Sequence, residues 1–341
     1  EPYLGAEWKE HLARMRAEAA ALSKTLPPQY PFLHALKDAA QPANARVAIR
    51  GDAQNLGEEA PRGFLQILGG RPFSRGSGRL ELAEAIASPA NPLTARVMVN
   101  RIWQWHFGEG IVRSPGNFGQ LGERPTHPEL LDYLAARFLE QGWSIKKLQR
   151  EILLSSTYAL STGHDPANHA RDPENKLLWR ANLRQRLDAE ALRDSLLAVS
   201  GRLDRTMGGP AAPLDENNRR RTVYGYVGRT TLDPMLALFD FPNPNNTSER
   251  RTVTVGPMQR LYFMNNAFVA AQANALAGQV ERRQAAEPAR IRELYRAALG
   301  RFPDEREIGW GREFLRSASA PGAWAQYAQA LLGSAEFSTI H

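Results

Sequence analysis

The chain of 341 residues is 43% hydrophobic and 23% charged, and it contains no cysteine. This composition excludes disorder, collagen and coiled coil as descriptions of the whole chain, and the missing thiols exclude disulfides, thiolate metal sites and covalently attached haem. The formal net charge is +7, but only six of the 43 cationic residues are Lys and the Arg residues are spread along the chain, which argues against a dedicated nucleic-acid partner.

The first predicted element is a helix over residues 5–23 within a separate N-terminal segment, residues 1–29. Apolar residues recur there at helical spacing: Trp8, Leu12, Met15 and Ala19. Residues 30–90 are rich in Gly and Pro, and we expect an extended segment that wraps the surface, with one strand-like alternation at residues 46–50.

The central predicted element is a helix over residues 91–108, which begins at an Asn-Pro pair and ends at Gly108. Apolar side chains cover nearly its whole circumference, and they include Trp103 and Trp105. A helix that is apolar almost all round is typical of a protein core. We therefore expect this helix to be buried at the centre of the fold.

One polar row interrupts that helix, at Arg96, Asn100 and Gln104, with Arg101 and His106 beside it. Buried Arg and Asn side chains need partners, so the row either lines a ligand-binding cleft or forms a structural network that ties loops to the helix. Both interpretations stay open on the sequence alone.

The rest of residues 91–341 is predicted to be a helical core that forms one compact unit, with an insertion over residues 202–256. Within the insertion, residues 222–227 and 252–255 alternate like strands and are expected to pair. The predicted fold class is mainly α: a multi-helical globular domain around a buried central helix, with a small antiparallel β element and long irregular segments.

Candidate catalytic residues are the acids Asp188, Glu190 and Asp194 at the start of a predicted helix. Glu190 and Asp194 are four residues apart, a geometry that general acid–base chemistry can use if burial raises one pKa. Arg184, Arg186 and Arg193 lie close in sequence, so a helix cap with ion pairs is the alternative.

Arginine residues flank the two predicted strands and would lie near one sheet edge, with two tyrosines nearby: Arg219, Arg220, Arg221, Arg250, Arg251, Tyr224 and Tyr226. Arg side chains bind sulfate, phosphate and carboxylate groups in bidentate fashion, so this edge could bind an acidic ligand or the acidic residues of a neighbouring domain. The alternative is a set of solvated charges that discourage strand pairing.

Two histidine-containing sets are candidate metal ligands: His127, Glu129 and Asp132, and His164, Asp165 and His169. Helix capping explains the first set, and the second lacks a ligand spacing typical of metal sites. The sequence also lacks the phosphate-binding loop, the HExxH motif and the GxSxG motif. We therefore predict no metal and no cofactor, and no recognisable catalytic motif.

Several runs of the sequence resemble a known signature: NPLTARVMVNRIW at 91–103, HFG at 106–108, SPGNFG at 114–119, THPELLD at 126–132, GWS at 142–144, RLDAE at 186–190, FDFP at 239–242 and ALGR at 298–301. Through them the chain, over roughly residues 30–340, resembles domain of unknown function family 1553. That family is found at the C-terminus of large secreted planctomycete-type proteins, which often carry a cytochrome-c-like module.

The resemblance implies an extracytoplasmic location and an upstream domain in the same full-length protein, but it implies no reaction. The leading hypothesis is a non-catalytic interaction or scaffold domain that docks to that upstream domain. The alternatives are an enzyme or binding module that acts on an acidic polysaccharide, and a general polyanion or nucleic-acid binder. No apolar run reaches the roughly 20 residues of a membrane span.

Overall fold

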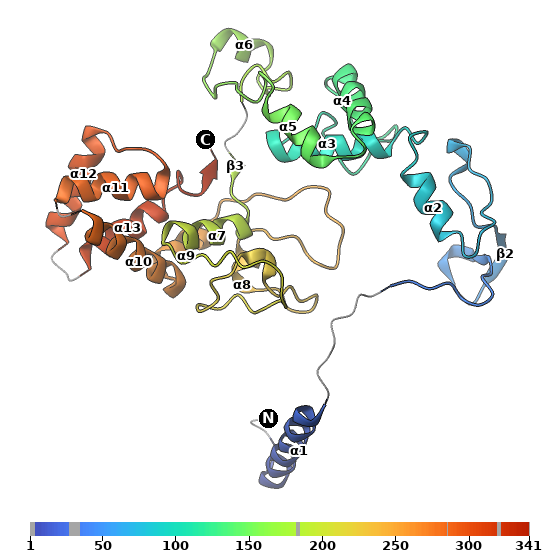
Figure 1. Ribbon diagram of the computed structural model, residues 1–341, viewed down its shortest axis with the longest axis horizontal. Coiled ribbons are helices and arrows are strands. Elements are labelled where there is room, and N and C mark those ends of the chain that lie inside the picture. The colour runs from blue at the N-terminus through green and yellow to red at the C-terminus, as the bar shows by residue number, and fades with distance from the viewer. Residues whose placement is uncertain (1–3, 27–34, 182–184, 285, 319–321, 341) are drawn as a thin grey trace. The chain divides into compact units, whose positions relative to one another are not determined.

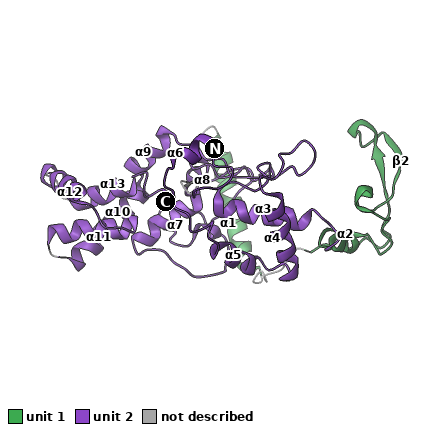
Figure 2. Ribbon diagram, turned by 90° about the horizontal axis from the view of Figure 1, so that it is seen from above, with its two compact units in different colours: residues 1–88 green, residues 89–341 purple. Residues whose placement is uncertain are grey.

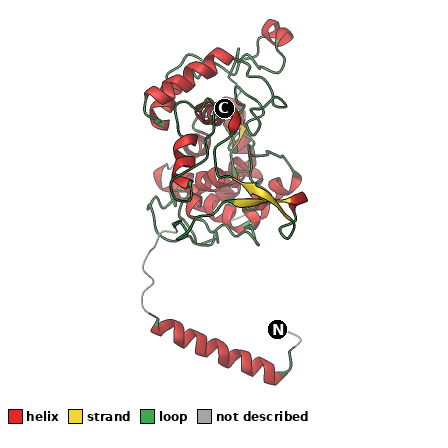
Figure 3. Ribbon diagram, turned by 90° about the vertical axis from the view of Figure 1, so that its right-hand side faces the viewer, coloured by secondary structure: helices red, strands yellow, loops and turns green. Residues whose placement is uncertain are grey.

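A computed structural model describes residues 4–26, 35–181, 185–284, 286–318 and 322–340. Helices dominate it and the strands are few and short, so the mainly-α fold class is confirmed (Figures 1 and 3). No helix within these ranges is long and apolar enough to cross a lipid bilayer. The chain divides between Ser88 and Pro89 into two compact units, which Figure 2 shows in different colours.

The first unit contains few elements: helix α1 (Ala6–Thr25), strands β1 (Ala45–Ala48) and β2 (Leu56–Ala60), the 3-10 turns η1 (Ile49–Gly51) and η2 (Gln66–Leu68), and helix α2 (Arg79–Ile86). β1 and β2 form an antiparallel hairpin, in which Ala45 lies opposite Ala60. The strand predicted at residues 46–50 is therefore present as β1 and followed by η1. Neither α1 nor α2 buries a residue.

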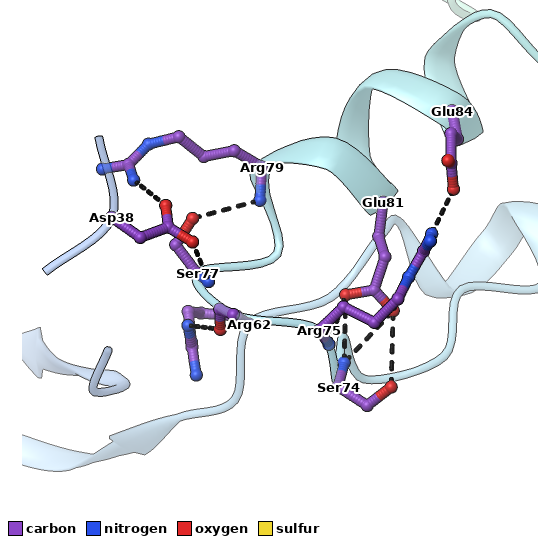
Figure 4. Close-up of polar contacts among 9 residues, drawn as sticks. Asp38, Arg62, Ser74, Arg75, Ser77, Arg79, Glu81 and Glu84 are labelled. Carbon is purple, nitrogen blue, oxygen red and sulfur yellow. Dashed lines mark hydrogen bonds and ion pairs between the residues drawn. The ribbon is translucent and has the colours of Figure 1, made fainter. Parts of the chain in front are cut away.

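Polar contacts organise the segment that leads into α2 (Figure 4). Asp38 accepts a hydrogen bond from the Ser77 backbone N–H at 2.8 Å and pairs with Arg79, also at 2.8 Å. Glu81 accepts bonds from the backbone N–H groups of Ser74 and Arg75, at 3.1 and 2.8 Å. These two carboxylates thus connect loops that share no apolar core.

The second unit begins with the elements around α3 (Thr94–Phe107): α4 (Pro128–Glu140), α5 (Ile145–Leu153) and α6 (Pro166–Arg171). Buried apolar residues of α3, α4, α5 and the 111–112 segment form one cluster, here called the α3 cluster. The predicted central helix is therefore a core helix, but it is not buried all round. Arg101 is exposed and Trp105 is 64% exposed, because α4 and α5 cover only the face that carries Val99, Ile102 and Trp103.

The second half of this unit is a larger helical assembly. Its helices are α7 (Ala189–Val199), α8 (Pro234–Leu238), α9 (Pro257–Asn265), α10 (Ala267–Arg283), α11 (Glu287–Leu299), α12 (Glu305–Ser317) and α13 (Ala323–Leu332). α10 and α13 pack along each other, and both contribute buried apolar residues to the same cluster, here called the α10 cluster. Asp304 and Glu307 form a reciprocal capping box at the start of α12.

The small antiparallel element of this unit lies elsewhere than the sequence suggested. β3 (Gln185–Arg186) pairs with β4 (Thr339–Ile340). The predicted strands at 222–227 and 252–255 do not pair: η3 (Thr222–Tyr224) is a 3-10 turn, and residues 251–256 have no regular structure. Carboxylates provide the reason, because Asp194 accepts the Thr222 N–H and Asp240 accepts the Thr254 N–H, which a strand partner would otherwise bind.

Candidate functional site

The three candidate acids lie at the N-cap and in the first half of helix α7. The two Arg-rich loops, which carry Arg221 and Arg251, both contact these acids. The helix begins after Asp188, whose side chain makes no capping hydrogen bond. Glu190 and Asp194 lie one turn apart, so they project from neighbouring positions on the helix. Asp188 and Glu190 bind one loop, and Asp194 binds the other.

Glu190 and Asp188 bind Arg251. The Arg251 guanidinium donates to both Glu190 oxygens, at 2.6 and 2.7 Å, and its Nη1 lies 3.6 Å from Asp188. The guanidinium also lies over the ring of Phe241, 5.3 Å from its centroid. The hydrogen bonds to Glu190 raise the pKa of Arg251 above its usual value. This bidentate pair anchors the 241–256 loop to α7.

Asp194 binds the other loop. One oxygen accepts both the backbone N–H and the hydroxyl of Thr222 at 2.7 Å, and the other lies 3.7 Å from Arg221. Thr222 is buried. The alternative considered for these acids was a helix cap with ion pairs to arginines close in sequence, but Asp188 makes no capping bond and the ion pairs are with Arg221 and Arg251. Arg184, one of the neighbours considered, lies outside the described residues, and Arg186 and Arg193 have other partners.

A buried ion pair that sequence reasoning missed lies beside this network. Arg186 pairs with Asp240, and the two side chains are 10% and 16% exposed. Asp240 also accepts the backbone N–H and the hydroxyl of Thr254, at 2.9 and 2.7 Å. Asp240 has a left-handed backbone with φ of 63°, which Asp tolerates better than most residues. In the sequence, the position of Asp240 in the FDFP run at 239–242 was the signal that could have pointed to this residue.

A cavity of about 320 Å³ adjoins this pair and is lined by the loop that follows α8. Its lining includes Asp240, Phe241 and Pro242 and residues with hydroxyl and amide side chains, among them Asn246 and Ser248. Hydroxyl and amide groups can donate and accept hydrogen bonds, so the cavity suits a small polar ligand.

The polar row of α3 is divided between structural contacts and unpaired atoms. Asn100 is fully buried, and its side chain exchanges two hydrogen bonds with the Val112 backbone, at 2.8 and 2.9 Å. Arg96 donates to Asp132 of α4 at 2.7 Å. These contacts are those of a network that ties loops and helices to α3.

The remaining residues near that row are Gln104, His106 and Arg101. Buried atoms Oε1 of Gln104 and Nε2 of His106 have no hydrogen-bond partner among the described residues. Burial lowers the pKa of His106 below its ordinary value. Arg101 lies on the exposed face. Arg101, Gln104 and His106 do not line the cavity next to Asp240.

The five arginines expected at one strand edge are distributed instead among separate contacts. Arg220 donates to the carbonyl oxygens of Thr206, Gly208 and Pro210 and lies over the Tyr224 ring, 4.3 Å from its centroid. Arg250 pairs with Glu109 at 3.4 Å.

Arg219 is exposed, and so is Tyr226. Since the two expected strands do not form, no sheet edge collects these groups.

Neither histidine set forms a metal site in the described residues. Asp165 caps α6 by accepting the Asn168 N–H at 2.9 Å, and the rings of His164 and His169 lie 4.9 Å apart. His127 is in contact with Thr126, at 2.9 Å. Across the ranges that the structure describes, no group of three or more His, Asp or Glu residues is placed to hold a metal ion.

Comparison with known proteins identifies a family. The model of a family described as PSD1, protein of unknown function (DUF1553), matches residues 78–315. The match therefore covers α2, the α3 cluster and most of the helices of the α10 cluster, and it leaves out α1 and the β1–β2 hairpin. No curated protein and no solved structure matches the chain.

Proposed function

Because the chain belongs to the PSD1 family of proteins of unknown function (DUF1553), we propose that it is a non-catalytic interaction domain of a larger extracytoplasmic protein. One observation carries this proposal: each acid of α7 is engaged by an arginine or a buried threonine from another loop. General acid–base catalysis needs a carboxyl group that is free to exchange a proton with substrate. Here the carboxylates serve to hold loops in place.

The proposed partner is another domain of the same full-length protein. Helix α1 supports this partner because its apolar row, predicted from Trp8, Leu12 and Met15, is not covered by any element of the first unit. Trp8 is 64% exposed and α1 buries none of its residues. Large exposed apolar groups in a row are typical of protein–protein contact surfaces. The extracytoplasmic location rests on the family resemblance.

Two measurements test the proposal. The first incubates the purified chain with polyuronates and with neutral polysaccharides and counts new reducing ends. We expect no turnover. Turnover that disappears in Glu190→Gln would identify α7 as catalytic and overturn the proposal.

The second measurement is association of the chain with the other domains of its full-length protein, by calorimetry. We expect binding at micromolar concentrations and a loss of about tenfold or more in Trp8→Ala, since a buried Trp contact dominates many interfaces. Trp310→Ala is the matched control, because Trp310 has the same exposure as Trp8 and lies outside α1. Absence of association would contradict the docking role.

A further inference from the structure

A second cavity, of about 330 Å³, lies between α7, α8, α9 and α10 in the second unit. Its apolar walls include Leu214, Met235 and Phe268. Arg193 of α7 and Tyr262 of α9 bring polar groups to the same walls. The acids Asp188, Glu190 and Asp194 are not part of the lining of this cavity.

Arg193 is a buried cation without a carboxylate partner in the described residues. The residue is 2% exposed, and its guanidinium donates only to neutral acceptors: the carbonyl oxygens of Asn218 and Arg220 and the hydroxyl of Thr222. Its charge lies over the Phe268 ring, 5.0 Å from the centroid. Burial lowers the pKa of Arg193, and the charges of Asp194, Asp233 and Asp215 oppose that shift. None of these carboxylates forms an ion pair with Arg193 among the described residues, so a ligand carboxylate at hydrogen-bond distance would supply the direct charged acceptor that the guanidinium lacks.

Tyr262 offers a hydroxyl donor at the same cavity. No hydrogen bond of this hydroxyl occurs among the described residues, whereas the ring packs edge-on against Phe239 at 5.3 Å. Burial raises the pKa of Tyr262 to about 12, so the hydroxyl keeps its proton at neutral pH. The cavity thus combines a cationic fork and a neutral donor.

Acidic side chains on the same cavity restrict the ligand further. Asp233 accepts the N–H groups at the start of α8, and Asp215 accepts those of Asn217 and Asn218. Each carboxylate still has lone pairs that can accept hydrogen bonds from ligand hydroxyls. Glu216, also on the lining, is exposed. A purely anionic ligand would be repelled by this set, whereas a ligand with one carboxylate and several hydroxyl donors would satisfy it.

We propose that this cavity binds a uronic acid residue of an acidic polysaccharide, with the sugar carboxylate on Arg193 and the hydroxyls on the acidic lining. Tyr262 donates to the bound sugar, and the apolar walls contact the C–H face of its ring. The volume lies in the range typical of small-ligand sites. This inference rests on the proposed interaction role in that it names a ligand that the domain binds without converting it.

The test measures binding of D-glucuronate to the intact chain by calorimetry, with D-glucose and acetate as comparisons. We expect glucuronate to bind with Kd on the order of 1 mM or tighter. Glucose lacks the carboxylate and acetate lacks the hydroxyls, so each should bind at least about tenfold more weakly. Equal binding of glucuronate and glucose would overturn the role of Arg193, and equal binding of glucuronate and acetate would overturn the sugar.

Two variants locate the site. Tyr262→Phe removes only a hydroxyl that makes no hydrogen bond within the described part of the chain, so the fold should persist while affinity for glucuronate falls about three- to tenfold. Arg193→Lys keeps the charge but loses the planar fork, and we expect a loss of more than about tenfold. Tyr224→Phe is the matched control, because Tyr224 lies outside the cavity lining, and its affinity should equal that of the wild type.

Unchanged affinity in Tyr262→Phe, in a variant that melts like the wild type, would overturn the site even if Arg193→Lys failed to fold. Failure of the glucuronate site can be distinguished from failure of the proposed interaction role. Turnover of polyuronates would overturn the non-catalytic role and leave glucuronate binding in place. No glucuronate binding would overturn this inference and leave docking to another domain untouched.

Discussion

The two units of the chain are stabilised in different ways. The second unit contains two clusters of buried apolar side chains, whereas none of the buried apolar residues in the described ranges belongs to the first unit. The first unit instead relies on hydrogen bonds and ion pairs at Asp38 and Glu81 and on the β1–β2 hairpin. An isolated hairpin or a single helix of this length is marginally stable in water. The stability of the first unit therefore depends on polar contacts and on the hairpin, not on buried apolar side chains of its own.

The extent of the family match agrees with this contrast. The matched residues run from 78 to 315, so they take in most of the second unit and only α2 among the helices and strands of the first. Exposed apolar side chains such as Ile67 and Leu36 then stand out in the first unit, because nothing in it covers them. This contrast between the two units predicts four effects on stability, of decreasing size.

Truncation of a core leucine should give the largest effect. Leu192 of α7 is fully buried in the α10 cluster, so Leu192→Ala should lower the free energy of unfolding by about 3–5 kcal/mol through lost contacts and a residual cavity. Ile67→Ala is the control in the first unit, where the side chain is 91% exposed, and it should cost less than about 0.5 kcal/mol. Urea unfolding followed by circular dichroism measures both. Similar values for the two variants would contradict the contrast.

The two units also differ in their ion pairs. Arg186→Gln leaves the mostly buried Asp240 without its cation, and we expect a loss of about 2 kcal/mol in unfolding free energy. Arg79→Gln removes the partner of Asp38 in the first unit, where both side chains are about half exposed, and should cost no more than about 1 kcal/mol. Thermal melting in low and high salt separates the cases, because only the exposed pair is strongly screened.

Asn100 provides a smaller test within the α3 cluster. Asn100→Ala removes both hydrogen bonds to Val112 and leaves a buried N–H and C=O unpaired, at a cost of about 1–2 kcal/mol. Asn44→Ala in the first unit is the comparison, since its bonds to Arg62 and Glu59 lie in contact with solvent, and we expect less than about 0.5 kcal/mol. Denaturant midpoints at constant slope report the difference. If Asn44→Ala were the more damaging, the first unit would have a core of its own.

Low pH should weaken the polar contacts of the first unit. This is the smallest of the four expected effects on stability. Hydrogen bonds from Ser77 lower the pKa of Asp38 below 3.8, and hydrogen bonds from the Arg75 backbone lower the pKa of Glu81 below 4.5. A carboxylate with a lowered folded pKa stabilises the fold above its unfolded value and loses that contribution as pH falls through the folded value. We expect the protection factor of the Ser77 amide to fall only when the pH drops below the ordinary Asp value of about 3.9, with unchanged protection in α10. Equal protection of Ser77 at pH 2 and pH 7 would contradict it.

The sequence predicted the helices better than the contacts between loops. The apolar pattern of residues 91–108 correctly indicated a core helix, because the period of a helix is a local property. It did not indicate that Trp105 would be exposed, since which face neighbours cover depends on the packing of α4 and α5. The alternation at 222–227 was misleading because Asp194, distant in sequence, takes the Thr222 N–H.

The candidate site shows the same limit. Asp188, Glu190 and Asp194 were selected from one stretch of sequence, and the structure does place them on one helix. Their partners Arg251 and Thr222 come from loops far along the chain, so sequence spacing could not indicate the pairs. The cavity at Arg193 and Tyr262 joins four helices, and no local pattern marks such a meeting point. Function predictions from this sequence therefore remained at the level of the family.

The pairing of β3 with β4 affects how the chain folds during synthesis. β3 directly precedes α7, and β4 lies at residues 339–340, so the two strands enclose every helix of the α10 cluster. A chain emerges from the ribosome N-terminus first. The α3 cluster lies wholly before β3 in the chain, so its residues are all synthesised before the α10 cluster begins. The β3–β4 pair can form only after every helix of the α10 cluster has been synthesised.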